Sequence, residues 1–190
     1  MIKKLAMGII LCMTVPAAAF AQGYIEAGAG NASTATDCTG MDACKDSSTG
    51  FKVSAGYLFN ERFGLEAVYF DMGKMTALET RLDNSKIGLQ IKTTGYGGGL
   101  LGLAPVGTNW VFNYRIGVLQ AKSARDITLG SSSVLKDSRT STAVYLGLGG
   151  GYNMTPNFTV AVEYDFFNAK DANNQSYTNK LLSLNARYKF

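Results

Sequence analysis

Histidine is absent from all 190 residues, and proline and cysteine occur three times each. Without histidine, a serine or cysteine nucleophile lacks its usual general base, and a metal site lacks a common nitrogen ligand. No apolar run after the N-terminus reaches the roughly 18 residues of a membrane-spanning helix. The 18 basic and 14 acidic residues nearly balance, which argues against nucleic-acid binding. These absences exclude a histidine-dependent enzyme, a helical membrane anchor and a nucleic-acid binder.

The N-terminus has the pattern of a secretory signal peptide. Lys3 and Lys4 precede an apolar run at 5–15, and residues 19–21 fit the small-x-small cleavage pattern. We therefore expect residues 1–21 to be removed and residues 22–190 to form a single domain. Removal lowers the formal net charge from +4 to +2.

Two cysteines of the mature chain, Cys38 and Cys44, lie in a polar segment at 33–50. An exported chain meets an oxidising compartment, so we expect them to form a disulfide. Metal binding by the two thiols is the alternative, but a site without histidine would be a poor one. The acidic residues around them could bind calcium, although a solvated acidic loop explains them better. We expect neither a metal ion nor a cofactor.

From residue 23 onward, stretches of about ten residues alternate between two kinds of side chain, which is typical of β-strands. The eight predicted strands lie at about 23–32, 51–59, 63–72, 86–104, 110–119, 140–153, 158–167 and 179–190. Their connections alternate in length, with long polar segments at 33–50, 73–85, 124–139 and 168–177. An even strand count with alternating short turns and long loops is typical of outer-membrane barrels. We therefore predict an all-β, eight-stranded antiparallel up-and-down transmembrane β-barrel, located in the outer membrane of a bacterium.

Charged residues fall on the face of the predicted strands that lies opposite the apolar rows. In a membrane barrel that face points inward, and an eight-stranded barrel is only wide enough to be filled by side chains. Charges of both signs should then pair with one another, either as a structural plug or as a gate. The predicted luminal charge network is Glu66, Arg115, Glu163, Arg187 and Lys189, with Glu26, Lys52, Lys92 and Asp165 on the same face.

The segments 160–164 and 182–190 resemble the OmpA-like family of small outer-membrane barrels, which includes porin-like and opacity-type proteins, and 113–117 and 64–66 match more loosely. The resemblance implies ion pairs that exchange partners to pass small ions, and a C-terminal signal at Tyr188 and Phe190 that the assembly machinery reads. OmpA carries a peptidoglycan-binding domain after its barrel, whereas this sequence ends at Phe190. The resemblance therefore does not imply peptidoglycan binding.

The predicted function is non-enzymatic, with a structural, weakly pore-like or adhesin-like surface-contact role. The partners would be outer-membrane lipid and a surface ligand bound through extracellular loops, with the barrel itself a monomer. One alternative is a lipid- or peptide-modifying enzyme, but PagL, PagP and the omptins, which share this architecture, use a catalytic histidine. The other is a soluble lipocalin-like barrel, which requires an apolar interior. A dinucleotide-like glycine spacing at 97–102 has no βαβ unit around it and more simply reflects small residues in a narrow barrel.

Overall fold

The computed structural model describes residues 22–34, 43–80, 86–129, 132–170 and 176–190. The predicted signal peptide at 1–21 lies outside the described residues, and so does Cys38 of the predicted Cys38–Cys44 disulfide, so both stay predictions. Within the described ranges, no helix has the length and hydropathy needed to cross a membrane. The strands are β1 (Gly23–Thr34), β2 (Ala43–Lys45), β3 (Ser47–Leu58), β4 (Phe63–Thr80), β5 (Lys86–Val106), β6 (Trp110–Leu129), β7 (Ser132–Asn153), β8 (Phe158–Lys170) and β9 (Ser176–Lys189).

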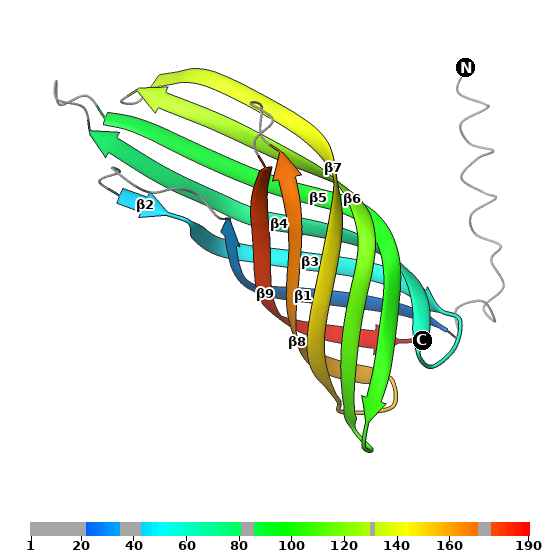
Figure 1. Ribbon diagram of the computed structural model, residues 1–190. Helices are drawn as coiled ribbons and strands as arrows, with labels where there is room; N and C mark the ends of the chain where they lie inside the picture. The colour runs from blue at the N-terminus through cyan, green and yellow to red at the C-terminus, as the bar shows by residue number, and fades with distance from the viewer. Residues whose placement is uncertain (1–21, 35–42, 81–85, 130–131, 171–175) are drawn as a thin grey trace, which may run out of the picture.

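The eight long strands form one closed antiparallel barrel. Their order is β4-β3-β1-β9-β8-β7-β6-β5, and β5 pairs back onto β4 to close the sheet. The first and last strands are neighbours, with Tyr24 opposite Lys189. The C-terminus lies at the same end as the short turns between β3 and β4, β5 and β6, and β7 and β8 (Figure 1). The predicted up-and-down barrel is confirmed, and β2 is an additional short strand paired with β4.

The strands extend much farther than the sequence predicted. β5, β6 and β7 contain 21, 20 and 22 residues, whereas about ten tilted residues suffice to cross the membrane. The segments 73–85 and 124–139 were predicted as polar loops, but β4, β6 and β7 continue into them. In Figure 1 the far ends of β4 to β7 run out to the upper left, away from the C-terminus. The apolar alternation ends at the boundary of the lipid. The backbone hydrogen bonds between strands do not require that alternation, so the strands continue beyond the membrane.

The sheet has a bulge near the outer boundary of the barrel. The register between β4 and β5 shifts between Asp71 and Lys74, and Gly73 there has a φ of 71°. Asp71 Oδ1 accepts a hydrogen bond from Gly73 N at 2.8 Å, which holds the bulge. The glycine-rich stretch 95–99 of β5 left a bulge possible, but both neighbouring strands pair with it without a register shift.

Apolar side chains cover the outside of the barrel and charged ones fill its inside. Leu184 on the outer face of β9 is 61% exposed, whereas Arg187 on the inner face of the same strand is 1% exposed. Aromatic rings gather near the short turns, among them Trp110 against Tyr152, with ring centroids 5.2 Å apart. This is the reverse of a soluble lipocalin-like barrel, and it suits an outer surface in contact with lipid.

Candidate functional site

The candidate site is a group of seven buried charged side chains in the barrel lumen, which we call the charge cluster. None of the seven is more than 5% exposed, because alternate residues of each strand point inward and the barrel closes around them. Six strands contribute: the members are Glu26 (β1), Lys52 (β3), Glu66 (β4), Arg115 (β6), Glu163 and Asp165 (β8) and Arg187 (β9).

The two remaining strands make room for these long side chains by presenting glycine. On β7, a Cβ added to Gly149 would lie 2.7 Å from Glu163 Cγ and 2.7 Å from the Val162 carbonyl oxygen. On β5, a Cβ added to Gly99 would lie 2.5 Å from the Tyr145 hydroxyl. Gly149 and Gly99 are therefore part of the site, because any side chain there would displace a member of the cluster or its support.

This close approach yields a stability prediction for two adjacent glycines of β7. We expect Gly149→Ala to lower the free energy of unfolding by roughly 1–3 kcal/mol, since the added methyl group overpacks the lumen. Gly150 points outward and a Cβ there meets nothing within 4 Å, so Gly150→Ala should change stability by less than about 0.5 kcal/mol. Denaturant unfolding of the two variants in the same lipid vesicles measures both values. Equal losses would mean that the two faces of β7 are wrongly assigned.

Arg115 lies at the centre of the charge cluster and touches three carboxylates. Its Nη2 donates to Glu26 Oε1 at 2.7 Å, its Nη1 donates to Glu163, and its Nε lies 3.2 Å from Glu66 Oε2. These carboxylates come from β1, β8 and β4. One guanidinium thus connects three walls of the barrel.

The other two cations complete the network. Arg187 Nε donates to Glu26 Oε2 at 2.7 Å, and its Nη2 lies 3.3 Å from Glu163 Oε1. Lys52 Nζ donates to Asp165 Oδ2 at 2.6 Å and also to Glu163, and it lies 3.8 Å from Glu26 Oε1. Each cation therefore contacts at least two carboxylates.

Three neutral side chains donate further hydrogen bonds to Glu66 and Glu163. The hydroxyls of Tyr24 and Tyr145 donate to Glu66 at 2.8 Å and 2.7 Å, and Asn113 Nδ2 donates to Glu163 Oε1 at 2.6 Å. These three residues were not among the predicted site residues, although Tyr24 and Asn113 share the inward face of their strands with members of the charge cluster. Tyr24 lies two residues before Glu26 and Asn113 two before Arg115, and that spacing would have found them.

Apolar layers seal the charge cluster from above and below. The layer toward the short turns consists of Tyr24, Leu58, Leu101, Leu103 and Val111, and the larger layer on the other side includes Phe70, Met72, Leu119, Phe167 and Leu181. The low polarity around the ion pairs strengthens their attraction but also makes any unpaired charge costly. Among the described residues the cluster holds four carboxylates against three cations, and the buried Asp165 Oδ1 has no hydrogen-bond partner.

The structure brings four of the five predicted network residues together: Glu66, Arg115, Glu163 and Arg187. Lys189 also points inward but lies beyond the lower apolar layer, where it lines a cavity of about 480 Å³ at the turn end with Glu61 and Leu103. It forms no ion pair with the cluster.

Lys92 was predicted to face inward, and the structure shows that this was wrong. β5 keeps one alternation throughout, so Lys92 shares the outer face with Tyr96 and Leu100 and pairs with Asp71 at 3.0 Å. The prediction assumed that the apolar row always faces outward. Beyond the lipid the outer face is wet, and Ile87, Leu89 and Ile91 face inward instead.

Tyr188 and Phe190, the predicted assembly signal, lie on the outer face at the turn end with ring centroids 5.4 Å apart. Phe190 N donates to Gly23 O at 2.9 Å, which joins the C-terminus to the first strand. Their recognition by the assembly machinery stays a prediction.

Comparison with known proteins places this geometry in a family. The model of the outer membrane protein beta-barrel domain matches residues 5–190. No curated protein matches the chain.

Three solved structures illustrate the likeness in fold. OprG from Pseudomonas aeruginosa is 17% identical with a TM-score of 0.58, over 90% of this chain and 96% of its own. Neisserial surface protein A is 17% identical with a TM-score of 0.55, over 89% and 97%. Ail of Yersinia pestis, solved with the heparin analogue sucrose octasulfate, is 20% identical with a TM-score of 0.52, over 89% and 99%. Since the match to the family model spans nearly the whole sequence, the chain belongs to the outer membrane protein beta-barrel domain family and is a bacterial outer-membrane protein.

Proposed function

We propose that this protein is a non-enzymatic outer-membrane barrel whose role is contact with other surfaces, made through the strands that extend beyond the membrane. We call this part the extracellular sheet, meaning residues 73–80, 86–94, 120–129 and 132–142 of β4 to β7. The observation that carries the proposal is strand length: β5 to β7 are 20 to 22 residues long, about twice the length that crosses a bilayer.

The extracellular sheet is a continuous ladder. β5 pairs with β6 up to Ile87 opposite Leu129, and β6 pairs with β7 up to Leu129 opposite Ser132, with a single register shift near residue 127. A paired sheet presents side chains in fixed positions, which lowers the entropy cost of binding relative to a mobile loop. A rigid surface held away from the membrane suits contact with another molecule or cell.

The proteins of similar fold are consistent with a surface role. Ail is the attachment invasion locus protein of Yersinia pestis, and the Neisserial protein is named a surface protein. At 20% identity or less these likenesses concern the fold.

The membrane part of the barrel supports a non-enzymatic role. The charged groups that could act as acids or bases are held in ion pairs between two apolar layers, and the sequence has no histidine. A substrate would have no route to these carboxylates without separating the pairs.

The proposal is tested by shortening the extracellular sheet without disturbing the barrel. Ser123 lies opposite Arg139 in the ladder, so an Asn-Gly turn can replace residues 124–138 and close a tight hairpin there. We expect the shortened protein to reach the outer membrane and keep its heat-modifiable gel mobility. Cells that express it should lose the adherence to epithelial cell layers or heparin-coated beads that the full chain confers. Equal adherence of both, or none from the full chain on either surface, would contradict the surface role.

A second candidate function is a small, rarely open ion path through the charge cluster. Lys52 has three carboxylates within 4 Å, and Asp165 Oδ1 lacks a partner. An exchange of partners by Lys52 would therefore break few contacts and could open a path for water and ions.

The conductance prediction follows from the same charges. In planar bilayers the wild-type barrel should pass little current, because its lumen is filled. Lys52→Met should raise the frequency of small openings. It leaves four buried carboxylates against two cations, and water must enter to solvate the excess negative charge. The lipid-facing change Val162→Ala is the control and should leave the current unchanged. A large, steady wild-type current that Lys52→Met does not alter would rule out the plugged lumen.

A further inference from the structure

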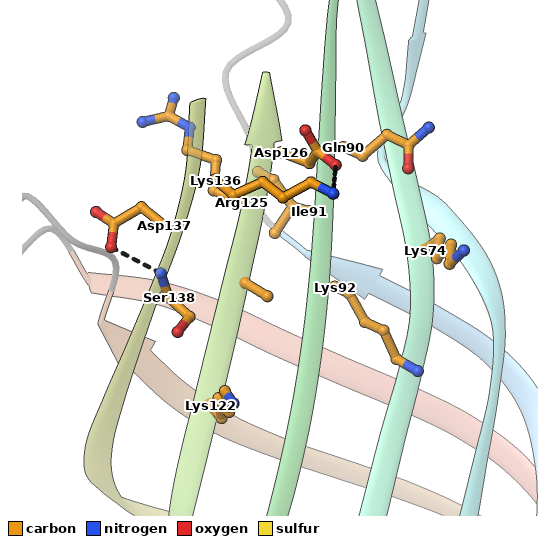
Figure 2. Close-up of a pocket in the computed structure, with 11 residues that line it drawn as sticks. Lys74, Gln90, Ile91, Lys92, Lys122, Arg125, Asp126, Lys136, Asp137 and Ser138 are labelled. Atoms are coloured by element: carbon orange, nitrogen blue, oxygen red, sulfur yellow. Dashed lines mark hydrogen bonds and ion pairs between the residues drawn. The ribbon is translucent and has the colours of Figure 1, made fainter. Parts of the chain in front are cut away.

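The outer face of the extracellular sheet carries a group of cationic side chains that the surface-contact role does not use. Lys74, Lys92, Lys122 and Lys136 are exposed on four adjacent strands around a cavity of about 560 Å³ (Figure 2). We call these four lysines the basic face. Arg125 lines the same cavity but lies on the inner face of β6, opposite Ile91. The carboxylates that line the same cavity are Asp126 and Asp137.

The basic face lies directly above the lipid-facing apolar rows. On β6, Lys122 follows Val118 by four residues on the same face, and on β5, Lys92 precedes Tyr96 by four. Four residues of a strand tilted by about 40° rise roughly 10 Å. The ammonium groups of Lys92 and Lys122 therefore stand at the level of the lipid headgroups, on the outer side of the wall, with apolar side chains below them.

The positive charge of the basic face is incompletely neutralised within the protein. Asp71 pairs with Lys92 at 3.0 Å, and Asp126 lies 3.6 Å from Lys136. Within the described part of the chain, no carboxylate lies within 4 Å of the ammonium groups of Lys74 and Lys122.

The arrangement of the lysines also favours a bound anion. Lys74 lies directly opposite Lys92 in the ladder of β4 and β5, where like charges repel. The hydrogen bond to Asp71 raises the pKa of Lys92, so this lysine stays protonated at neutral pH. Lys122 is a diagonal neighbour, since Lys92 pairs with Ala124. An anion bound among the three lysines would offset this repulsion.

We propose that the basic face binds the phosphate groups of the phosphorylated glycolipid that forms the outer leaflet of the outer membrane. The position of the cations on the lipid side of the wall favours a lipid over a soluble anion. A phosphate at Lys74, Lys92 and Lys122 would leave the acyl chains of the same molecule against the apolar row of Tyr96, Leu100 and Val118. One ligand thereby matches both the charged and the apolar parts of the surface.

The test measures glycolipid binding by the full chain, folded in bilayers of uncharged phospholipid. Purified lipid A with its phosphates is compared with the same glycolipid after removal of the phosphates. We expect the wild type to prefer the phosphorylated form, and the double variant Lys74→Gln, Lys122→Gln to bind it about tenfold more weakly or worse, because each lysine near an anionic surface adds to the affinity. The matched control is Lys170→Gln, Lys180→Gln on β8 and β9, which makes the same charge change on the opposite wall and should keep most of the affinity.

Several results would overturn the proposal. Equal binding of both glycolipid forms would exclude recognition of phosphate, and equal losses in the two double variants would mean diffuse attraction without a site. Full displacement by millimolar inorganic phosphate would indicate a site for the free anion. Binding of heparin that depends on Lys74 and Lys122, with glycolipid binding unaffected, would assign the face to a sulfated polysaccharide. Heat-modifiable mobility of each variant verifies that the barrel has folded.

Discussion

Replacing Arg115 by alanine is expected to lower the free energy of unfolding by about 3–5 kcal/mol, the range found when one partner of a buried ion pair is removed. Arg115 is 3% exposed, and its guanidinium contacts carboxylates of β1, β4 and β8. Its loss leaves Glu26, Glu66 and Glu163 with fewer cations in a sealed lumen, and each uncompensated carboxylate is costly to bury. Denaturant unfolding in lipid vesicles measures the change.

The control for Arg115→Ala is Val162→Ala on the outer face of β8. Val162 is 54% exposed in the structure and faces lipid. Its truncation therefore removes contacts with fluid acyl chains and leaves the packing of the lumen unchanged. The loss should be below about 1 kcal/mol, in the range of surface changes. If Arg115→Ala costs no more than Val162→Ala, the charge cluster contributes little to stability and is not the plug described above.

Introducing a charge at Val162 is the second change with a large expected effect. Val162 lies midway along the apolar row of β8 between Phe158 and Phe166, so Val162→Arg places a guanidinium near the middle of the bilayer. We expect a loss of about 2–4 kcal/mol, the cost of arginine at the midplane of an outer-membrane barrel. Equilibrium unfolding from vesicles measures it.

Val134→Arg is the matched substitution outside the membrane. Val134 is 63% exposed near the start of β7, in the extracellular sheet, so its replacement should change stability by no more than about 0.5 kcal/mol. The contrast between the two valines therefore maps the lipid boundary on the strands. A harmless Val162→Arg would indicate an aqueous outer surface, and a costly Val134→Arg would place the extracellular sheet within the lipid.

The barrel could be predicted from the sequence because the lipid imposes a simple rule on each strand. Alternation at Trp110, Phe112 and Tyr114 against Val111, Asn113 and Arg115 marks two faces, and the structure confirms them. Even the pairing of inward charges followed from this rule, since an eight-stranded lumen leaves no space between them. The alternation arises because one face of each strand contacts lipid, and this effect is stronger than the intrinsic strand preferences of the residues.

The extracellular sheet could not be predicted by the same rule. In 124–129 and 134–139 neither face is uniformly apolar, because both are partly exposed to water, so the period of two disappears although the ladder continues. The inward position of Ile91 and the outward position of Lys92 follow from this change of surroundings. The ion-pair partners of each cation could not be predicted from the sequence either, because they depend on the stagger of strands that lie far apart in the chain.

Quenching of the single tryptophan by brominated lipids tests most directly whether the apolar outer face of the barrel meets lipid. Trp110 is 60% exposed on that face, at the turn end of β6, where aromatic side chains gather at a membrane interface. For the wild-type chain in vesicles we predict clear quenching, stronger with bromine near the headgroup than with bromine deep in the acyl chains. No quenching by either lipid, or strongest quenching by the deep bromines, would contradict the account.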